Sequence, residues 1–220
     1  MLKRLFDILF SLVGIVLLFP LMLFVGMLIF FTSGRPVFFI QKRVTQWGRL
    51  FSIIKFRTMS NVYDKDKVGI QVSSSSSFIT PVGRILRKLK LDELPQLFNI
   101  LLGDMSFVGP RPELPRRLVF YTSKEMDVFS VKSGITSPAS ICFSDEEYLM
   151  EEVSSPEEFY IKKILPLKAD MNLDYIERRS FSFDLLIIWK TIEKVFLPRF
   201  SSNDNIISKD LIERKVMLNR

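Results

Sequence analysis

Two adjacent carboxylates, Asp92 and Glu93, follow a run of cations in this chain of 220 residues. A carboxylate that attacks phosphorus, or that holds a divalent cation, must be ionised at neutral pH, and neighbouring positive charge lowers its pKa. The pattern therefore indicates phosphate chemistry at this pair. The cations that precede the pair and are placed to supply that charge are Arg84, Arg87, Lys88 and Lys90.

The composition excludes several other chemistries. The chain has no histidine, so it has neither a Ser-His-Asp nor a Cys-His site and lacks the commonest zinc ligand. Its one cysteine, Cys142, has no intrachain disulfide partner, which fits a reducing compartment and excludes a cysteine-rich metal cluster. We interpret Cys142 as a packing residue.

The net charge of +7 favours an anionic partner, which by charge alone is nucleic acid, acidic lipid or a phosphorylated substrate. No nucleic-acid-binding signature accompanies the basic residues, and many of them flank an apolar segment. The sequence therefore predicts a membrane surface as the partner and no nucleic acid.

The apolar segment at residues 8–34 has no charged residue and exceeds the about 20 residues that cross a bilayer as a helix. Pro20 lies near its middle, which predicts a sharp kink. Basic residues flank both ends, which favours a cytoplasmic position for both. The residues alone leave a kinked span and a re-entrant hairpin open, and both place the remaining chain in the cytoplasm.

The downstream segments carry further cations. Residues 49–59 predict a short strand with Lys55 and Arg57 on one face, although lysines also guard solvated strand edges. Residues 61–77 predict a loop, and a basic amphipathic helix follows. The next helix has Pro95 in its first turn and ends at Gly103, so the pair should lie at its N-terminus, where negative charge is stabilised.

Asp92 and Arg111 each have a simpler interpretation beside the functional one. Asp92 at that place is also an ordinary N-cap, a role that contributes about 1 kcal/mol. Arg111 lies between two prolines, and a guanidinium held in such a turn can bind phosphate oxygens in a bidentate manner. A surface turn with an unused cation is the alternative.

Three blocks of sequence together closely resemble the bacterial sugar transferases known as monotopic phosphoglycosyl transferases, in particular small members such as the bacillosamine-phosphate transferases. Weaker similarity continues to about residue 191, so the resemblance covers nearly the whole chain. The blocks are Lys55-Phe56-Arg57-Thr58-Met59, Leu91-Asp92-Glu93-Leu94-Pro95-Gln96-Leu97-Phe98-Asn99 and Gly103-Asp104-Met105-Ser106-Phe107-Val108-Gly109-Pro110-Arg111-Pro112.

The resemblance implies an α+β, mostly helical interfacial membrane protein with a small β element. Residues 1–34 would form a re-entrant membrane helix broken at Pro20, residues 35–200 a cytoplasmic catalytic domain with interfacial helices, and residues 201–220 a polar tail. The expected location is the bacterial inner membrane, with the catalytic domain on the cytoplasmic face. Whether the protein is a homo-oligomer is left open.

The same resemblance implies transfer of a sugar-1-phosphate from a UDP-sugar to undecaprenyl phosphate, with release of UMP, as a first membrane step of glycoconjugate assembly. Asp92 would be the nucleophile and Glu93 a ligand of Mg²⁺. The competing hypothesis is a non-catalytic membrane adaptor that binds anionic lipid and partner enzymes. The cations implied as phosphate-binding residues are Lys55, Arg57, Arg84, Arg87 and Arg111.

The chain departs from the family pattern at several places. Phe19 stands where a polar residue often precedes the breaking proline, and Asn172 stands where an aspartate is expected. Asp170 and Asp174 are neighbours of Asn172, and the sequence leaves open whether either replaces the aspartate. The apolar stretch at 181–196 predicts either an interfacial helix or a core helix.

Overall fold

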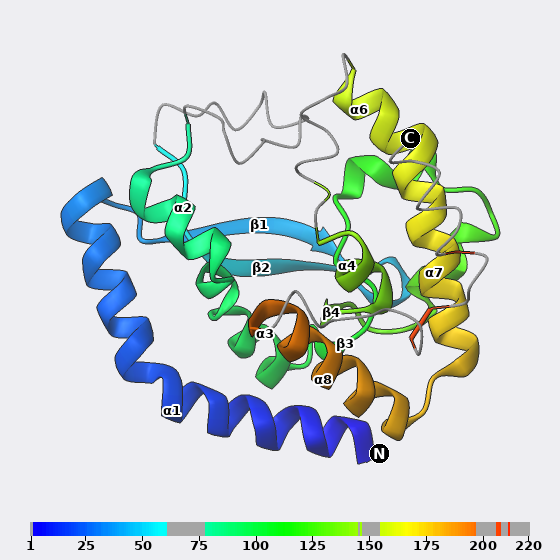
Figure 1. The fold of residues 1–220 in the computed structure, drawn as a ribbon, viewed down its shortest axis with the longest axis horizontal. Helices are drawn as coiled ribbons and strands as arrows, with labels where there is room; N and C mark the ends of the chain where they lie inside the picture. The colour runs from blue at the N-terminus through cyan, green and yellow to red at the C-terminus, as the bar shows by residue number, and fades with distance from the viewer. Residues whose placement is uncertain are drawn as a thin grey trace.

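The computed structural model describes residues 2–60, 78–144, 146, 155–196, 206, 207 and 211. The loop predicted at 61–77 and most of the predicted tail lie outside these residues. The described chain is mostly helical with two small sheets, which confirms the predicted α+β class (Figure 1).

The described elements follow one another in a simple order. The helices are α1 (Leu2–Ser33), α2 (Pro81–Lys88), α3 (Gln96–Leu102), α4 (Pro138–Cys142), α6 (Pro156–Phe159), α7 (Leu165–Arg178) and α8 (Phe181–Phe196), with a π-helical turn at Tyr160–Ile164. The strands are β1 (Phe38–Val44), β2 (Leu50–Phe56), β3 (Ser106–Val108) and β4 (Gly134–Thr136). Single 3-10 turns or short 3-10 helices lie at Gln46–Gly48, Leu91–Glu93, Pro115–Phe120 and Glu125–Ser130.

The N-terminal helix α1 is one continuous element with Pro20 inside it, and among the described residues it alone is long and apolar enough to cross a membrane. Its ribbon bends about halfway and follows two sides of the body (Figure 1). A proline removes one helical hydrogen bond and crowds the preceding turn, which accounts for the bend. The predicted break at Pro20 is therefore a bend within a helix that stays continuous.

Both ends of α1 are fastened to the same body by polar contacts. At its start, the three charged side chains Lys3, Arg4 and Asp7 contact α3, β3 and α8. At its end, the guanidinium of Arg57 donates to the carbonyl oxygens of Ser33 and Gly34, the latter at 2.8 Å. The partners at the start are the carbonyl oxygens of Ile100 (2.7 Å) and Leu101 (2.8 Å) for Arg4, Asp184 and the Val108 carbonyl for Lys3, and the Ser106 hydroxyl and Phe107 N–H for Asp7.

Strands β1 and β2 form an antiparallel hairpin in which Phe38 pairs with Phe56 and Val44 with Leu50. Successive side chains of a strand alternate between its faces, so Phe51, Ile53 and Lys55 share one face of β2. Phe51 and Ile53 pack against α3 in one apolar cluster. The same row then continues to Lys55, which is therefore directed toward the start of α3.

Strands β3 and β4 pair in parallel, and Gly109 and Gly134 allow the two backbones to approach closely beside this pairing. A Cβ placed on Gly134 would lie 2.2 Å from the backbone nitrogen of Gly109, so neither chain could pass so closely with side chains at both positions. Because β3 ends just before Gly109, this pairing fixes the start of the turn that carries Arg111.

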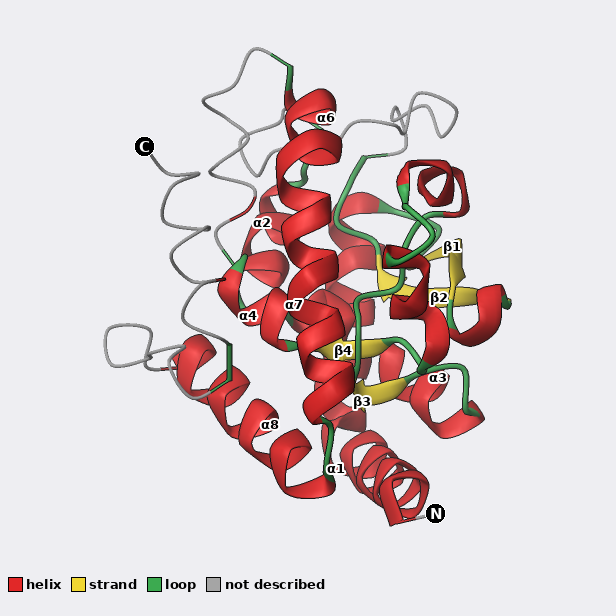
Figure 2. Ribbon diagram, turned by 90° about the vertical axis from the view of Figure 1, so that its right-hand side faces the viewer, coloured by secondary structure: helices red, strands yellow, loops and turns green. Residues whose placement is uncertain are grey.

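The largest apolar cluster lies among α4, α7 and α8, at the side of the body where Figure 2 shows α7 and α4 adjacent. Cys142 is buried there, which confirms its predicted packing role. Ile206 and Ile207, from the segment predicted as a polar tail, are also buried in this cluster. On α8, Ile187 faces the cluster while Trp189 is exposed, so the helix is both a core helix and an amphipathic surface helix.

Candidate active site

The carboxylate pair lies in the 3-10 turn Leu91–Glu93, directly after α2 and just before α3. Lys90 precedes the turn in a left-handed conformation (φ 56°), which lets the chain change direction sharply between α2 and this turn. Pro95 is the residue before α3. The prediction that the pair lies just before the N-terminus of this helix is therefore confirmed.

Glu93 joins three elements that are distant in the sequence. Its Oε1 accepts hydrogen bonds from Nζ of Lys55 and from Nη2 of Arg111, each at 2.7 Å. Lys55 comes from β2 and Arg111 from the turn after β3. The side chains of Glu93 and Lys55 are 12% and 16% exposed, whereas that of Arg111 is 50% exposed. Three of the predicted site residues thus meet at one carboxylate oxygen.

The pKa values of the two carboxyl groups are shifted in opposite directions. Burial alone would raise the pKa of Glu93, but Arg111 and Lys55 outweigh burial and hold that pKa well below its usual range. The pKa of Glu93 is therefore lowered as predicted, but by Arg111 and Lys55 and not by the four cations that precede the pair. These two cations make Glu93 the anionic centre of the cluster.

For Asp92 the same prediction is wrong. Burial raises the pKa of Asp92, and the negative charge of Glu93 raises it further. Lys55, Arg87 and Lys90 oppose these effects without cancelling them. The side chain of Asp92 is thus a desolvated carboxyl group beside an anion, the environment in which a carboxylate is least stabilised by water.

Helix α2 lies directly on the chain that follows β2. A Cβ on Gly83 would lie 2.1 Å from the carbonyl oxygen of Thr58, so only glycine permits this approach. Nε of Arg87 donates to the Thr58 hydroxyl at 3.1 Å, which holds Arg87 beside the site, while Arg84 lies on the exposed face of α2. Of the predicted phosphate-binding cations, Arg57 is directed elsewhere, because it binds the end of α1.

Comparison with known proteins gives a family for this arrangement. The family model described as bacterial sugar transferase matches residues 1–198. The chain belongs to the bacterial sugar transferase family.

Individual members of the bacterial sugar transferase family match over most of the chain. The uncharacterized sugar transferase EpsL of Bacillus subtilis is 34% identical over 95% of this chain and 94% of its own length. The UDP-N-acetylgalactosamine-undecaprenyl-phosphate N-acetylgalactosaminephosphotransferase of Aeromonas hydrophila is 35% identical over 88% of this chain. The UDP-glucose:undecaprenyl-phosphate glucose-1-phosphate transferase of Escherichia coli is 34% identical over 90%. The chain spans less than half of the latter two, namely 43% and 41% of their lengths.

Glu93 carries a carboxylate of the kind that can bind magnesium together with substrate phosphates. No group of three or more acidic or cysteine side chains that could hold a metal occurs among the described residues. Mg²⁺ is commonly held by one or two protein carboxylates together with substrate phosphates, and it keeps several waters. Glu93, ionised and next to Asp92, would supply the protein part of such a set.

Helix α7 carries Asn172 together with its acidic neighbours Asp170 and Asp174. Asn172 is buried in α7, with its Oδ1 lacking a hydrogen-bond partner, and Asp174 pairs with Arg178 at 2.9 Å one turn further along. Residues two positions away on an α-helix are rotated by about 200°, so Asp170 and Asp174 lie on the side of α7 opposite to Asn172. Neither aspartate therefore lies on the side of α7 that carries Asn172.

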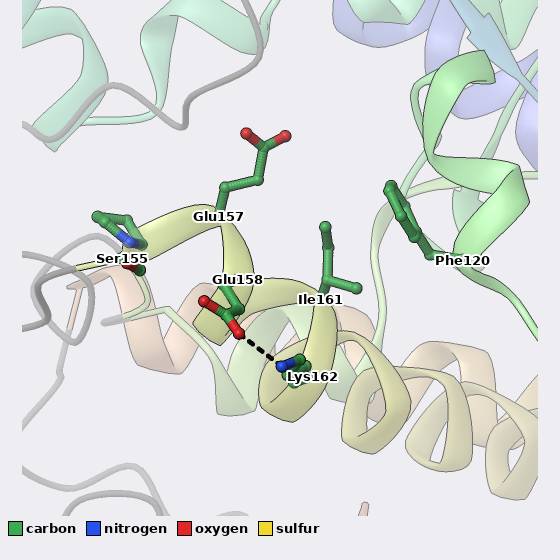
Figure 3. A pocket seen from close by; sticks show the side chains of 7 residues that line it. Phe120, Ser155, Glu157, Glu158, Ile161 and Lys162 are labelled. Atoms are coloured by element: carbon green, nitrogen blue, oxygen red, sulfur yellow. Dashed lines mark hydrogen bonds and ion pairs between the residues drawn. The ribbon is translucent and has the colours of Figure 1, made fainter.

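A separate hollow of about 560 Å³ lies between α6 and Phe120 (Figure 3). Glu158 and Lys162, which Figure 3 joins by a dashed line, form an exposed ion pair at its wall, and such pairs contribute little. None of the predicted site residues lines it. This hollow is therefore separate from the carboxylate pair.

Lys90 and Asn99 both adjoin the site. Lys90 acts to lower the pKa of Asp92, as its place in the cation run before the pair predicted. Asn99 contacts β2 through its side chain. It ends the second block of the family resemblance, but the sequence assigned it no role in the site.

Proposed function

We propose that the protein is a phosphoglycosyl transferase that moves a sugar-1-phosphate from a UDP-sugar to undecaprenyl phosphate and releases UMP. The single observation that carries the proposal is the buried Asp92 beside the Glu93, Lys55 and Arg111 cluster, next to a membrane-length helix. The names of the Aeromonas hydrophila and Escherichia coli relatives describe reactions of this class.

The proposed reaction has two displacements at one phosphorus. An oxygen of the Asp92 carboxylate attacks the phosphorus that bears the sugar, a bond forms between them, and the bond from that phosphorus to UMP breaks. The phosphate oxygen of undecaprenyl phosphate then attacks the same phosphorus, and the bond to Asp92 breaks. Asp92 returns as a free carboxylate, and the lipid carries a diphosphate linked to the sugar. The soluble donor and the membrane-held acceptor therefore need not occupy the site together.

The burial of Asp92 is compatible with a nucleophile. Its raised pKa means that water stabilises the anion less than usual, while Lys55, Arg87 and Lys90 still favour the ionised form. Arg111, half exposed at the edge of the cluster, is the cation best placed to meet incoming phosphate oxygens.

Glu93 is the residue proposed to hold Mg²⁺. When bound, the ion would neutralise phosphate charge that otherwise repels an attacking carboxylate. Lys55 and Arg111 already hold Glu93 in one orientation, so this carboxylate is fixed before substrate arrives.

We propose that α1 is a re-entrant membrane helix and that the body lies on the cytoplasmic face. The contacts of Arg4 at its start and of Arg57 at its end both reach the same body, and a helix that crossed a bilayer of about 30 Å would separate its ends. The exposed apolar side chains of α1 and α8 would then contact lipid.

The test uses the full chain in lipid nanodiscs with Mg²⁺ and undecaprenyl phosphate. UMP release is measured across a panel of UDP-sugars for the wild type and for Asp92→Asn. We expect release with at least one donor, its loss in the variant, and unchanged recovery of the variant in the membrane fraction. Without acceptor, the wild type should accumulate a phosphosugar adduct on Asp92 that mass spectrometry detects.

The same variant separates this proposal from the adaptor hypothesis. A non-catalytic adaptor would keep its cellular function in Asp92→Asn, since the substitution changes neither the membrane helix nor the basic surface. UMP release that persists in Asp92→Asn, or product that forms with no adduct on Asp92, would overturn the enzymatic mechanism.

A further inference from the structure

Asn99 of α3 forms two hydrogen bonds with the free edge of β2. Its Nδ2 donates to the carbonyl oxygen of Ser52 at 2.8 Å, and its Oδ1 accepts from the backbone N–H of Ile54 at 3.0 Å. Ser52 and Ile54 pair with β1 at positions where the N–H and C=O groups of β2 face away from that strand. The side-chain amide therefore occupies the place of a third strand, and the residue is 1% exposed.

These two bonds fix α3 along the length of β2. Two residues of a strand advance by about 6.7 Å and one helical turn by about 5.4 Å, so side chains on the facing rows meet at only one register. In that register Phe51 and Ile53 pack on α3, and Lys55 meets Glu93 at 2.7 Å. Apolar packing alone tolerates sliding, whereas a pair of hydrogen bonds to one peptide edge does not.

Asn99 also holds the far end of α3. Its backbone carbonyl oxygen accepts from the N–H groups of Gly103, Asp104 and Met105, which ends the helix. The side chain fixes α3 against β2, and the main chain fixes its C-terminus. A displacement of Asn99 would therefore be transmitted to the whole of this short helix and to the carboxylate pair before it.

We propose that Asn99 is a positioning residue of the active site, which sets the alignment of Lys55 with Glu93 and, through Glu93, the placement of Asp92. The inference rests on the proposed function. It assigns Asn99 no contact with substrate, and its effect passes entirely through the Lys55 and Glu93 pair.

The first test compares Asn99→Leu and Asn99→Asp with Ser52→Ala as the matched control. Leucine has a similar size and forms neither bond, so kcat/KM for UMP release should fall by about tenfold to a hundredfold, the range expected for a misplaced site. Ser52 contributes its carbonyl oxygen and not its side chain, so Ser52→Ala should keep wild-type kcat/KM. All rates are measured well below the unfolding temperature of each variant.

The pH dependence of Asn99→Asp is the second readout. When the introduced carboxyl group is ionised, it places an oxygen against the Ser52 carbonyl. When it is protonated, its O–H can donate to that carbonyl and its other oxygen still accepts from Ile54. The ratio of variant to wild-type kcat/KM should therefore rise as the pH falls from about 8 to about 6. The ratio for Asn99→Leu, which carries no introduced carboxyl group, should stay flat.

The double variant Lys55→Met with Asn99→Leu separates positioning from general stability. If Asn99 acts through Lys55, the second substitution should cost less than about threefold in kcat/KM once Lys55 is absent. Independent, multiplying losses would overturn the inference, as would wild-type kcat/KM in a folded Asn99→Leu or a flat ratio in Asn99→Asp. If the wild type itself released no UMP with any donor, the proposed function would fail instead.

Discussion

The two ion pairs to Glu93 have equal length and different burial, so they allow the contribution of burial to be measured directly. Lys55 and Arg111 each lie 2.7 Å from the same Oε1, but the Lys55 side chain is 16% exposed and that of Arg111 is 50% exposed. We expect Lys55→Met to lower the free energy of unfolding more than Arg111→Met does. Methionine keeps much of the apolar packing of either side chain, so the change isolates the charge.

The magnitude follows from the environment of each bond. A hydrogen bond to a charged group contributes about 1.5 to 3 kcal/mol when buried, whereas an exposed ion pair contributes about 0 to 1 kcal/mol. Lys55→Met leaves Glu93 paired with Arg111, so the larger penalty of an unpaired buried charge does not apply. At about 2 to 4 °C per kcal/mol for a chain of this size, Tm should fall by about 3 to 12 °C for Lys55→Met and by at most about 4 °C for Arg111→Met.

The assay is thermal unfolding in one detergent, followed by the fluorescence of the two tryptophans. Glu93→Gln provides the upper reference, because it leaves the buried Lys55 without its carboxylate and should lower Tm more than either single cation variant. Equal decreases for Lys55→Met and Arg111→Met, or a larger one for Arg111→Met, would refute the reasoning that burial decides the strength of these pairs.

Three further predictions concern other parts of the molecule. Because burial and Glu93 raise the pKa of Asp92 above 3.8, and the nucleophile must be ionised, the acid limb of kcat/KM for UMP release should lie above pH 3.8. A limb at or below that value in a pH-rate profile would contradict the assignment. Gly83→Ala places a Cβ 2.1 Å from the Thr58 carbonyl oxygen, so α2 must move. A typical point substitution costs about 1 kcal/mol, and thermal unfolding should show a decrease in Tm for Gly83→Ala well beyond the decrease that this cost produces. Asp7→Leu leaves the N–H of Phe107 (3.2 Å from Asp7 Oδ1) without an acceptor, at about 1 to 3 kcal/mol, and an unchanged Tm would show that this contact contributes nothing.

The long or strongly patterned elements were predictable because their signals are local. The length and apolar character of α1, the bend at Pro20, the alternation in β2 and the proline before α3 each depend on neighbouring residues alone. These elements suffice to place Asp92 and Glu93 before a helix and Lys55 on a strand face.

The electrostatics of Asp92 could not be predicted in this way. The sequence shows four cations before the pair, and from them a lowered pKa follows. Burial is decided by how α2, β2 and α3 pack, and at Asp92 it outweighs those cations, whereas at Glu93 two direct contacts outweigh burial. The pKa values of the two adjacent residues are thus shifted in opposite directions, and the cations that lower the pKa of Glu93 lie far from it in the sequence.

The pairing of β3 with β4 could not be predicted from the sequence either. Each strand has three residues, too few for a periodic pattern, and parallel strands come together from distant parts of the chain. Yet this pairing, with Gly109 and Gly134 in close contact, is what holds the Arg111 turn near Glu93.

Arg57 shows how the anchor and the site are connected. The alternation of the sequence predicted Arg57 and Lys55 on one face of a strand. Strand β2 ends at Phe56, however, and the two cations bind different partners. Lys55 binds Glu93, and Arg57 binds the end of α1, so one short segment joins the site to the apolar helix. Arg4 and Asp7 add contacts from the start of α1 to α3 and β3, the elements that adjoin the carboxylate pair and the Arg111 turn. Helix α1 is therefore part of the framework that holds these side chains in place, because its polar contacts reach α3, β3 and the residue that follows β2.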